Sequence, residues 1–385
     1  MKKILILIIA FICFITFNNG NKTNVIAEEN INLNGDKCIV LEVSTGKVLY
    51  ASNEHTKAFP ASMTKMMGMY LVLESIHEGK IDFDDEVTCS EYASSMGGTQ
   101  IYLEPGEQMK VEELFKAVAI NSANDAIVCL GEYIFGDNDS FINAMNKKAK
   151  ELKMNNTNFV NATGFDDESH YTTPYDMALI GRQLVLDYPE VLSYSSLAED
   201  YIKGNRNEEF WLVNTNKLLK HCNGMDGLKT GYTSKAGYNL TATVKRNGIR
   251  VISVVMNEKS IQERSQDTIR LVNYAFSKLK IERLFSKDQV IGTYQFPNSM
   301  SLDTNIYLKD DVDIVLGSED DINSIKTTIV ITNIKLPLNQ GDIVGKLEVK
   351  YSTGETIYFD LIVKDDVEKT SFIKIWINNI IKWIV

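Results

Sequence analysis

The sequence predicts an α+β fold, in which one antiparallel sheet is flanked by helices and carries a helical insert. Strand patterns near residues 38–50 flank a tight turn. Helix-length apolar patterns follow over residues 66–186, and strand patterns return over residues 228–256. Because strands stand on both sides of the helices, we expect a single sheet assembled from both ends of this region.

Length, composition and charge restrict the class of protein. The chain has 385 residues, which favours more than one domain. Its apolar fraction of 44% and charged fraction of 24% are ordinary for a globular protein. The formal net charge is −11, and no basic block offsets it, so we expect no nucleic-acid partner.

The N-terminus predicts export. Lys2 and Lys3 precede an apolar run over residues 4–17, and small residues lead up to Ala27. We therefore expect a signal peptide over residues 1–27 and secretion across the cytoplasmic membrane. A retained membrane anchor is the alternative, although the run is short for a membrane span.

Cysteines and histidines give no sign of a disulfide framework or a metal centre. Cys38, Cys89, Cys129 and Cys222 follow the signal peptide without close pairing, so we expect buried free thiols. The histidines form no His-Glu-x-x-His pair. We expect neither a metal nor a cofactor.

The elements follow in order along the first domain, expected over residues 35–282. Strands are expected over residues 38–43 and 48–50, and again over 238–244 and 249–256, where Asn247-Gly248 marks a hairpin. Helices are expected in five places, the second of them broken at residues 121–124: residues 60–78, 111–133, 140–152, 175–186 and 261–279.

The remainder of the chain predicts a small all-β domain over residues 288–364, because short alternating stretches are separated by polar turn residues. Residues 368–385 differ from it: lysines recur among Ile, Phe and Trp at helical spacing. We expect an amphipathic helix that anchors the protein to the outer face of the cytoplasmic membrane. A final strand or a helix docked on the β domain is the alternative.

A possible nucleophile stands at the start of the helix near residue 60. Ser62 lies in its first turn, and Lys65 follows three residues later on the same face. A lysine that becomes buried beside a serine can act as the base that activates it, without histidine. Ser-x-x-Lys alone is common, so the prediction depends on partners elsewhere.

Two further motifs supply those partners. Ser122-Ala123-Asn124 falls at the break between predicted helices, and Lys229-Thr230-Gly231 falls on a predicted strand. Each is weak alone, but the three in this order in an exported chain form the set typical of penicillin-binding proteins and β-lactamases. The chain thus resembles the D-alanyl-D-alanine carboxypeptidases of the low-molecular-mass penicillin-binding proteins over about residues 36–276.

The resemblance implies an enzyme that removes the terminal D-Ala from peptidoglycan stem pentapeptides and is acylated by β-lactams. Ser62 would attack the carbonyl, Lys65 would take its proton, and Ser122 would pass a proton to the leaving group. Asn124, Lys229, Thr230 and Gly231 would bind the substrate. The resemblance also implies an oxyanion hole from the backbone N–H groups of Ser62 and Tyr232, and a role near the site for Arg264.

Three other functions fit parts of the sequence. A β-lactamase shares the three motifs but needs an added base, and residues 161–194 contain no Glu-x-x-x-Asn stretch to supply one. A non-catalytic penicillin- or wall-binding module is disfavoured because the motif residues Ser62, Lys65, Ser122 and Lys229 are all intact. A Ser-His-Asp esterase is disfavoured because no Gly-x-Ser-x-Gly elbow is present.

Overall fold

The computed structural model describes residues 31–299, 303–333 and 335–370 of the chain. The expected signal peptide lies outside the described residues. Most of the expected C-terminal amphipathic helix, from residue 371 onward, also lies outside them. Within the described part of the chain, no helix combines the length and apolar character needed to cross a membrane.

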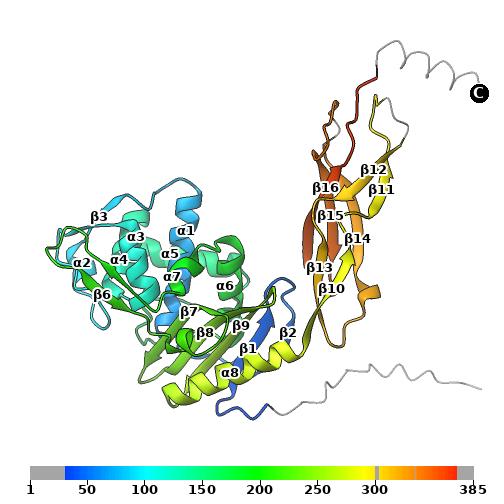
Figure 1. Ribbon diagram of the computed structural model, residues 1–385. Coiled ribbons are helices and arrows are strands. Elements are labelled where there is room, and N and C mark those ends of the chain that lie inside the picture. The colour runs from blue at the N-terminus through cyan, green and yellow to red at the C-terminus, as the bar shows by residue number, and fades with distance from the viewer. Residues whose placement is uncertain (1–30, 300–302, 334, 371–385) are drawn as a thin grey trace, which may run out of the picture. The chain divides into compact units, whose positions relative to one another are not determined.

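The first sheet is antiparallel and has the strand order β2-β1-β9-β8-β7 (Figure 1). It combines β1 (Lys37–Glu42) and β2 (Val48–Ser52) with β7 (Met225–Thr233), β8 (Gly237–Arg246) and β9 (Ile249–Glu258). The strand from the start of the chain pairs directly with β9, as with Val40 opposite Ser253. The expectation of one sheet built from both ends of the region is therefore confirmed. β7 lies at the edge of this sheet, so among the described strands it pairs with β8 alone.

Helices cover both faces of this sheet, as Figure 1 shows. α8 (Ile261–Ser277) packs against β8, β9 and β1, while α6 (Pro174–Asp187) packs against the same strands and also contacts α1 (Lys65–His77). Two of these helices begin with a side-chain cap: Ser260 Oγ accepts the backbone N–H of Glu263 at the start of α8, and Thr173 accepts that of Asp176 at the start of α6. Such a cap satisfies an N–H group that the first helical turn leaves unpaired.

The helical insert lies between β2 and β7 in sequence. Besides α1 and α6, it contains the helices α3 (Val111–Lys116), α4 (Asn124–Phe135) and α5 (Asn138–Glu151). The remaining pieces are short: β3 (Glu86–Thr88), α2 (Glu91–Ser94), β4 (Gln108–Lys110), α7 (Val191–Ser195), β5 (Glu199–Ile202) and β6 (Phe210–Val213). These short strands were not expected from the sequence, because three or four residues are too few to show an alternating pattern. The four cysteines expected as buried free thiols are buried and free.

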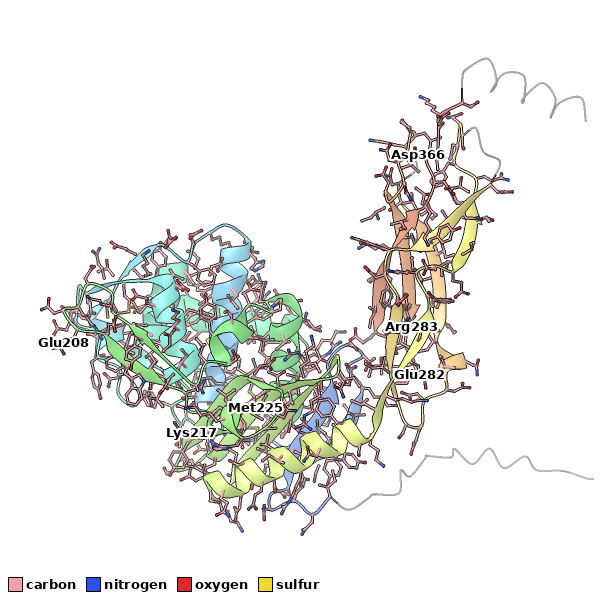
Figure 2. The ribbon with its side chains drawn as sticks, viewed as in Figure 1. Glu208, Lys217, Met225, Glu282, Arg283 and Asp366 are labelled. Carbon is pink, nitrogen blue, oxygen red and sulfur yellow. The ribbon has the colours of Figure 1, made fainter. Side chains whose placement is uncertain are left out.

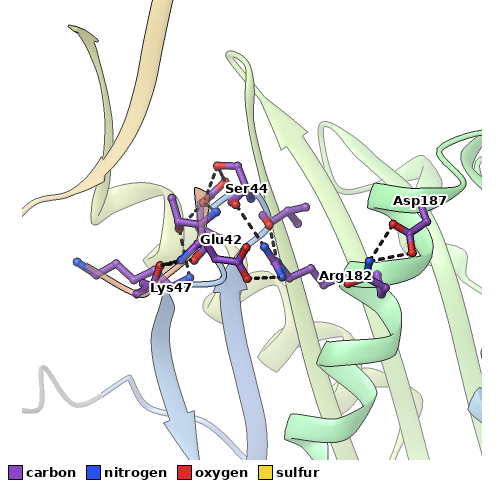
Figure 3. Close-up of polar contacts among 10 residues, drawn as sticks. Glu42, Ser44, Lys47, Arg182 and Asp187 are labelled. Carbon is purple, nitrogen blue, oxygen red and sulfur yellow. Dashed lines mark hydrogen bonds and ion pairs between the residues drawn. The ribbon is translucent and has the colours of Figure 1, made fainter. Parts of the chain in front are cut away.

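The turn between β1 and β2 is held by two buried charged side chains (Figure 3). The carboxylate of Glu42 accepts the backbone N–H groups of Ser44 and Thr45 at 2.9 and 2.7 Å. From α6, Arg182 donates its Nε–H to the carbonyl of Val43 at 2.6 Å. The turn is therefore tied to the helix that covers the sheet.

The second domain is built from strands, as the sequence predicts. One sheet has the order β11-β12-β16-β15-β14, and a two-stranded sheet pairs β10 with β13. The strands are β10 (Leu279–Phe285), β11 (Val290–Tyr294), β12 (Thr304–Leu308), β13 (Val312–Gly317), β14 (Lys326–Ile331), β15 (Ile343–Lys350) and β16 (Thr356–Val363). They enclose an apolar core of their own, which includes Ile306, Leu347 and Leu361.

β10 was not expected as a strand. Glu282 and Arg283, which Figure 2 labels on it, are adjacent charged residues that interrupt the alternation of apolar and polar residues begun at Leu279. Arg283 pairs with Asp313 of β13 through a 2.8 Å bond, so partners about 30 positions away hold the segment extended.

Candidate active site

Ser62 lies in a 3-10 turn, Ala61–Thr64, and not in the α-helix expected there. α1 begins only at Lys65. Ala61 has a φ of 48°, in the left-handed region that costs a non-glycine residue energy. Two close neighbours fix this turn: a Cβ on Gly164 would lie 1.9 Å from the Ala61 carbonyl oxygen, and one on Gly231 would lie 2.6 Å from the Pro60 carbonyl oxygen. The Ser62 turn is thus held between two glycine backbones.

Lys65 is fully buried and directs its amine at Ser62. Its Nζ lies 3.0 Å from Ser62 Oγ and 2.8 Å from the carbonyl oxygen of Thr163. Burial, and then the positive charge of Lys229, hold the pKa of the Lys65 amine well below its ordinary value. A neutral amine has a lone pair, so Lys65 can accept the Ser62 proton.

Ser122 and Asn124 stand where the helical insert changes direction. A π-helical turn, Ala117–Asn121, ends at Ser122, which has a left-handed φ of 67°. The Ser122 hydroxyl is buried and has no hydrogen-bond partner among the described residues. Asn124 donates its amide to the carbonyl of Gly97 at 2.7 Å, while its Oδ1 is buried without a partner in the described part of the chain.

Asp125 connects this motif to the neighbouring loop. Its buried carboxylate accepts the backbone N–H groups of Ile101 and Leu103 at 3.1 to 3.2 Å. The Asn124 N–H also donates to the Thr99 carbonyl at 2.7 Å. The loop is therefore fastened to the start of α4, and the partnerless polar atoms of Ser122 and Asn124 are held in place.

The third motif lies on β7, the edge strand that begins at Met225, labelled in Figure 2. Lys229 is 1% exposed, and burial followed by the charge of Arg264 lowers its pKa to about 7. Arg264, on α8, is also buried and leaves its Nε without a partner among the described residues. Neither side chain takes part in an ion pair within the described residues. Two buried cations of this kind form a site for an anion.

Tyr232 is the exposed member of the predicted set. Its side chain is 56% exposed and stacks on Tyr238, with ring centroids 4.3 Å apart. It follows Gly231, where β7 passes close to the Ser62 turn. The backbone of Tyr232 therefore directly follows the residue at which β7 passes the Ser62 turn.

Two contacts in the site could not be read from the sequence. The Thr163 carbonyl that binds Lys65 belongs to the backbone, which every residue type supplies. Thr215 contacts Thr230 through a 2.7 Å bond between their hydroxyl oxygens, but it stands in no recognisable motif. Only the folded chain brings these residues to the three motifs.

Taken together, the site has a hydroxyl next to a buried amine, and two buried basic side chains that have no carboxylate partner in the described part of the chain. Such an arrangement suits nucleophilic acyl transfer to a substrate that carries a negative charge near the reacting carbonyl.

Comparisons with known proteins agree with this chemistry. A family model described as D-alanyl-D-alanine carboxypeptidase matches residues 23–260. A second model, described as the C-terminal domain of penicillin-binding protein 5, matches residues 279–369. The D-alanyl-D-alanine carboxypeptidase DacF of Bacillus subtilis is 37% identical over 381 residues, covering 97% of this chain and 96% of the relative.

Solved structures give the same result. Penicillin-binding protein 5 from Haemophilus influenzae is 29% identical with a TM-score of 0.65, covering 88% of this chain and 98% of that one. Penicillin-binding protein D2 from Listeria monocytogenes, in its ampicillin-bound form, is 32% identical with a TM-score of 0.58, covering 64% of this chain and 99% of that one. This chain therefore belongs to the D-alanyl-D-alanine carboxypeptidase family of serine peptidases.

Proposed function

We propose that the protein removes the terminal D-Ala from peptidoglycan stem pentapeptides through an acyl-enzyme on Ser62. The observation that carries this proposal is the 3.0 Å contact between Ser62 Oγ and the buried amine of Lys65. The low pKa of that amine makes it a base for the hydroxyl proton. Family membership supplies the substrate class.

In acylation, the Lys65 amine takes the proton of Ser62 while Oγ attacks the carbonyl carbon of the penultimate D-Ala. The backbone N–H groups of Ser62 and Tyr232 stabilise the oxyanion. The peptide bond then breaks, and its electron pair goes to the D-Ala nitrogen, which receives a proton through Ser122. Asn124 positions the substrate amide. Water finally hydrolyses the ester and returns the hydroxyl to Ser62.

The terminal carboxylate of the substrate binds Lys229, Thr230 and Arg264. The two buried cations support this assignment, because a carboxylate would neutralise charges that burial now opposes. Gly231 lets the edge strand approach the substrate backbone. A β-lactam would enter the same site with its own carboxylate and acylate Ser62, as the ampicillin-bound relative suggests.

We also propose where the enzyme works. Residues 1–27 would direct export, residues 35–282 would form the catalytic domain, and residues 288–364 would form the β-rich domain. Residues 368–385 would hold the protein to the outer face of the cytoplasmic membrane, close to its polymeric substrate. The Lys/Trp/Ile pattern of that last segment supports the anchor.

Release of D-Ala from a synthetic stem pentapeptide, with and without penicillin, tests the function. We expect release that penicillin blocks, and covalent labelling by a fluorescent penicillin. Ser62→Ala should abolish both, whereas Ser95→Ala, at an exposed serine, should change neither. Labelling that persists in Ser62→Ala would remove Ser62 as the nucleophile, and a wild-type protein that releases no D-Ala would overturn the function.

A further inference from the structure

His170 lies buried beside the Ser62 turn, with 1% of its surface exposed. Its Nε2 is 2.8 Å from Thr64 Oγ1, and its Nδ1 is 3.0 Å from the backbone nitrogen of Val160. Both ring nitrogens are therefore used in contacts with backbone or side chains far apart in the sequence. The ring also packs on Phe159, at a centroid distance of 5.7 Å.

These contacts define the tautomer of the His170 ring. A backbone N–H can only donate, so Nδ1 must accept the hydrogen bond from Val160 and cannot carry a proton itself. The proton of the neutral ring therefore lies on Nε2 and is donated to Thr64 Oγ1. Burial lowers the pKa of His170 to about 4; the Lys65 charge adds to this effect, and Asp167 and Asp166 oppose it. The ring is thus neutral at neutral pH.

The two partners of His170 belong to the two segments that hold the Lys65 amine. Thr64 directly precedes Lys65 in the turn that carries Ser62. Val160 opens the loop that supplies the Thr163 carbonyl, 2.8 Å from Lys65 Nζ. Further along that loop, Gly164 packs on the Ala61 carbonyl. One imidazole ring therefore fastens the lysine-bearing turn to the loop that binds the lysine.

We propose that His170 is a positioning residue for Lys65, which acts by holding the Thr64 turn and the 160–165 loop at the separation that the lysine amine requires. This inference rests on the proposed function, because it assigns His170 to the activation of Ser62. The ring does not touch the reacting atoms. Its effect passes through Thr64 on one side and through the Thr163 carbonyl on the other.

Three substitutions separate the two contacts. His170→Asn places an amide oxygen near the position of Nδ1 and can keep the Val160 bond. His170→Gln places an amide NH2 near the position of Nε2 and can keep the Thr64 bond. His170→Ala removes both contacts. The readout is the rate of acylation by labelled penicillin against pH, measured on the purified full-length chain below its melting temperature and scaled to the folded fraction.

We expect His170→Ala to lower the acylation rate about tenfold or more. We also expect the acidic limb of its pH profile to move to higher pH, because water that reaches Lys65 raises the pKa of the amine. Asn and Gln should each recover part of the rate. Thr64→Val, which removes the acceptor of the Nε2 proton, should resemble His170→Asn. His221→Ala, at an exposed histidine, is the matched control and should match the wild type.

If His170 only stabilised the fold, its substitution would lower stability but leave the acidic limb of the pH profile unchanged once the acylation rate is scaled to the folded fraction. That result would overturn the proposal. Equal rates for the Ala, Asn and Gln variants would also overturn it. Failure of the proposed function is distinguishable, because the wild-type chain would then release no D-Ala from the pentapeptide, whatever the His170 variants do to the acylation rate.

Discussion

Lys229 of β7 and Arg264 of α8 are two buried basic side chains whose like charges repel each other, and the charge of Lys229 also acts on Lys65. Burial and the Arg264 charge together lower the pKa of Lys229 to about 7. Keeping both groups charged in a buried site is unfavourable unless an anion joins them. The arrangement is therefore prepared for a carboxylate at the end of the substrate.

Lys229→Ala should lower kcat/KM for peptides that end in D-Ala-D-Ala more than it lowers kcat/KM for an uncharged ester. Loss of a charged hydrogen bond costs about 1.5–3 kcal/mol, or roughly ten- to a hundredfold in kcat/KM. A fall in kcat/KM that is common to both substrates would report the loss of the Lys229 charge, which helps to lower the pKa of Lys65. Steady-state kinetics on the two substrates measures the difference, with Lys235→Ala at an exposed position as control. Equal losses on both substrates would refute carboxylate binding by Lys229.

Gly164→Ala should disrupt the Ser62 turn. The added Cβ would lie 1.9 Å from the Ala61 carbonyl oxygen, on a backbone with a φ of 91°. We expect a loss of about 2 kcal/mol or more in stability and a large fall in penicillin acylation. Gly136→Ala is a matched control, since Gly136 has the same φ of 91° with no atom within 4 Å of the added Cβ. Gly136→Ala therefore reports the cost of backbone strain alone. Normal acylation by Gly164→Ala would show that a Cβ at this position does not disturb the Ser62 turn.

Ionisation of the buried Glu258 carboxyl should lower the stability of the protein as the pH rises. Burial, and then the charge of Asp267, raise the pKa of the Glu258 carboxyl from 4.5 to about 7. The folded chain thus binds this proton more tightly than the unfolded chain. Its stabilising effect is full below about pH 4.5 and is lost as the pH rises through about 7, by up to a few kcal/mol.

The substitution Glu258→Gln tests this prediction, because an amide does not titrate. Calorimetric melting temperatures between pH 5 and pH 8 should fall less in Glu258→Gln than in the wild type, by several degrees. Glu208→Gln, at an exposed position labelled in Figure 2, should follow the wild type. Parallel curves for Glu258→Gln and the wild type would show that Glu258 does not titrate in this range.

Deletion of residues 371–385 should release the protein from membranes and leave pentapeptide hydrolysis in solution unchanged. The physical reason is that the apolar side chains of this segment provide the burial in the membrane interface. Sedimentation of membranes after expression, followed by activity measurements on both fractions, gives the answer. A truncated protein that still sediments with membranes would refute the C-terminal anchor.

The sequence alone predicted most of the fold and named the candidate residues of the site. Strand and helix periods are local signals, so the sheet, the helical insert and the β-rich domain could be predicted from them. Ser62, Lys65 and Lys229 could be proposed as site residues because their motifs have fixed spacing and a required chemistry. The local patterns did not predict β10 or the short strands, whose extended form depends on distant pairing partners, as Arg283 with Asp313 shows.

The tertiary structure decided how the site is held. Ser62 lies in a 3-10 turn that packs closely against the backbones of Gly164 and Gly231, and neither glycine is near Ser62 in sequence. Likewise, the Thr163 carbonyl and the His170 ring reach the lysine turn only after the chain folds. The residue types by themselves determine which reactive groups the chain carries. Burial, which lowers the pKa of Lys65 and Lys229, arises only when distant segments exclude water together.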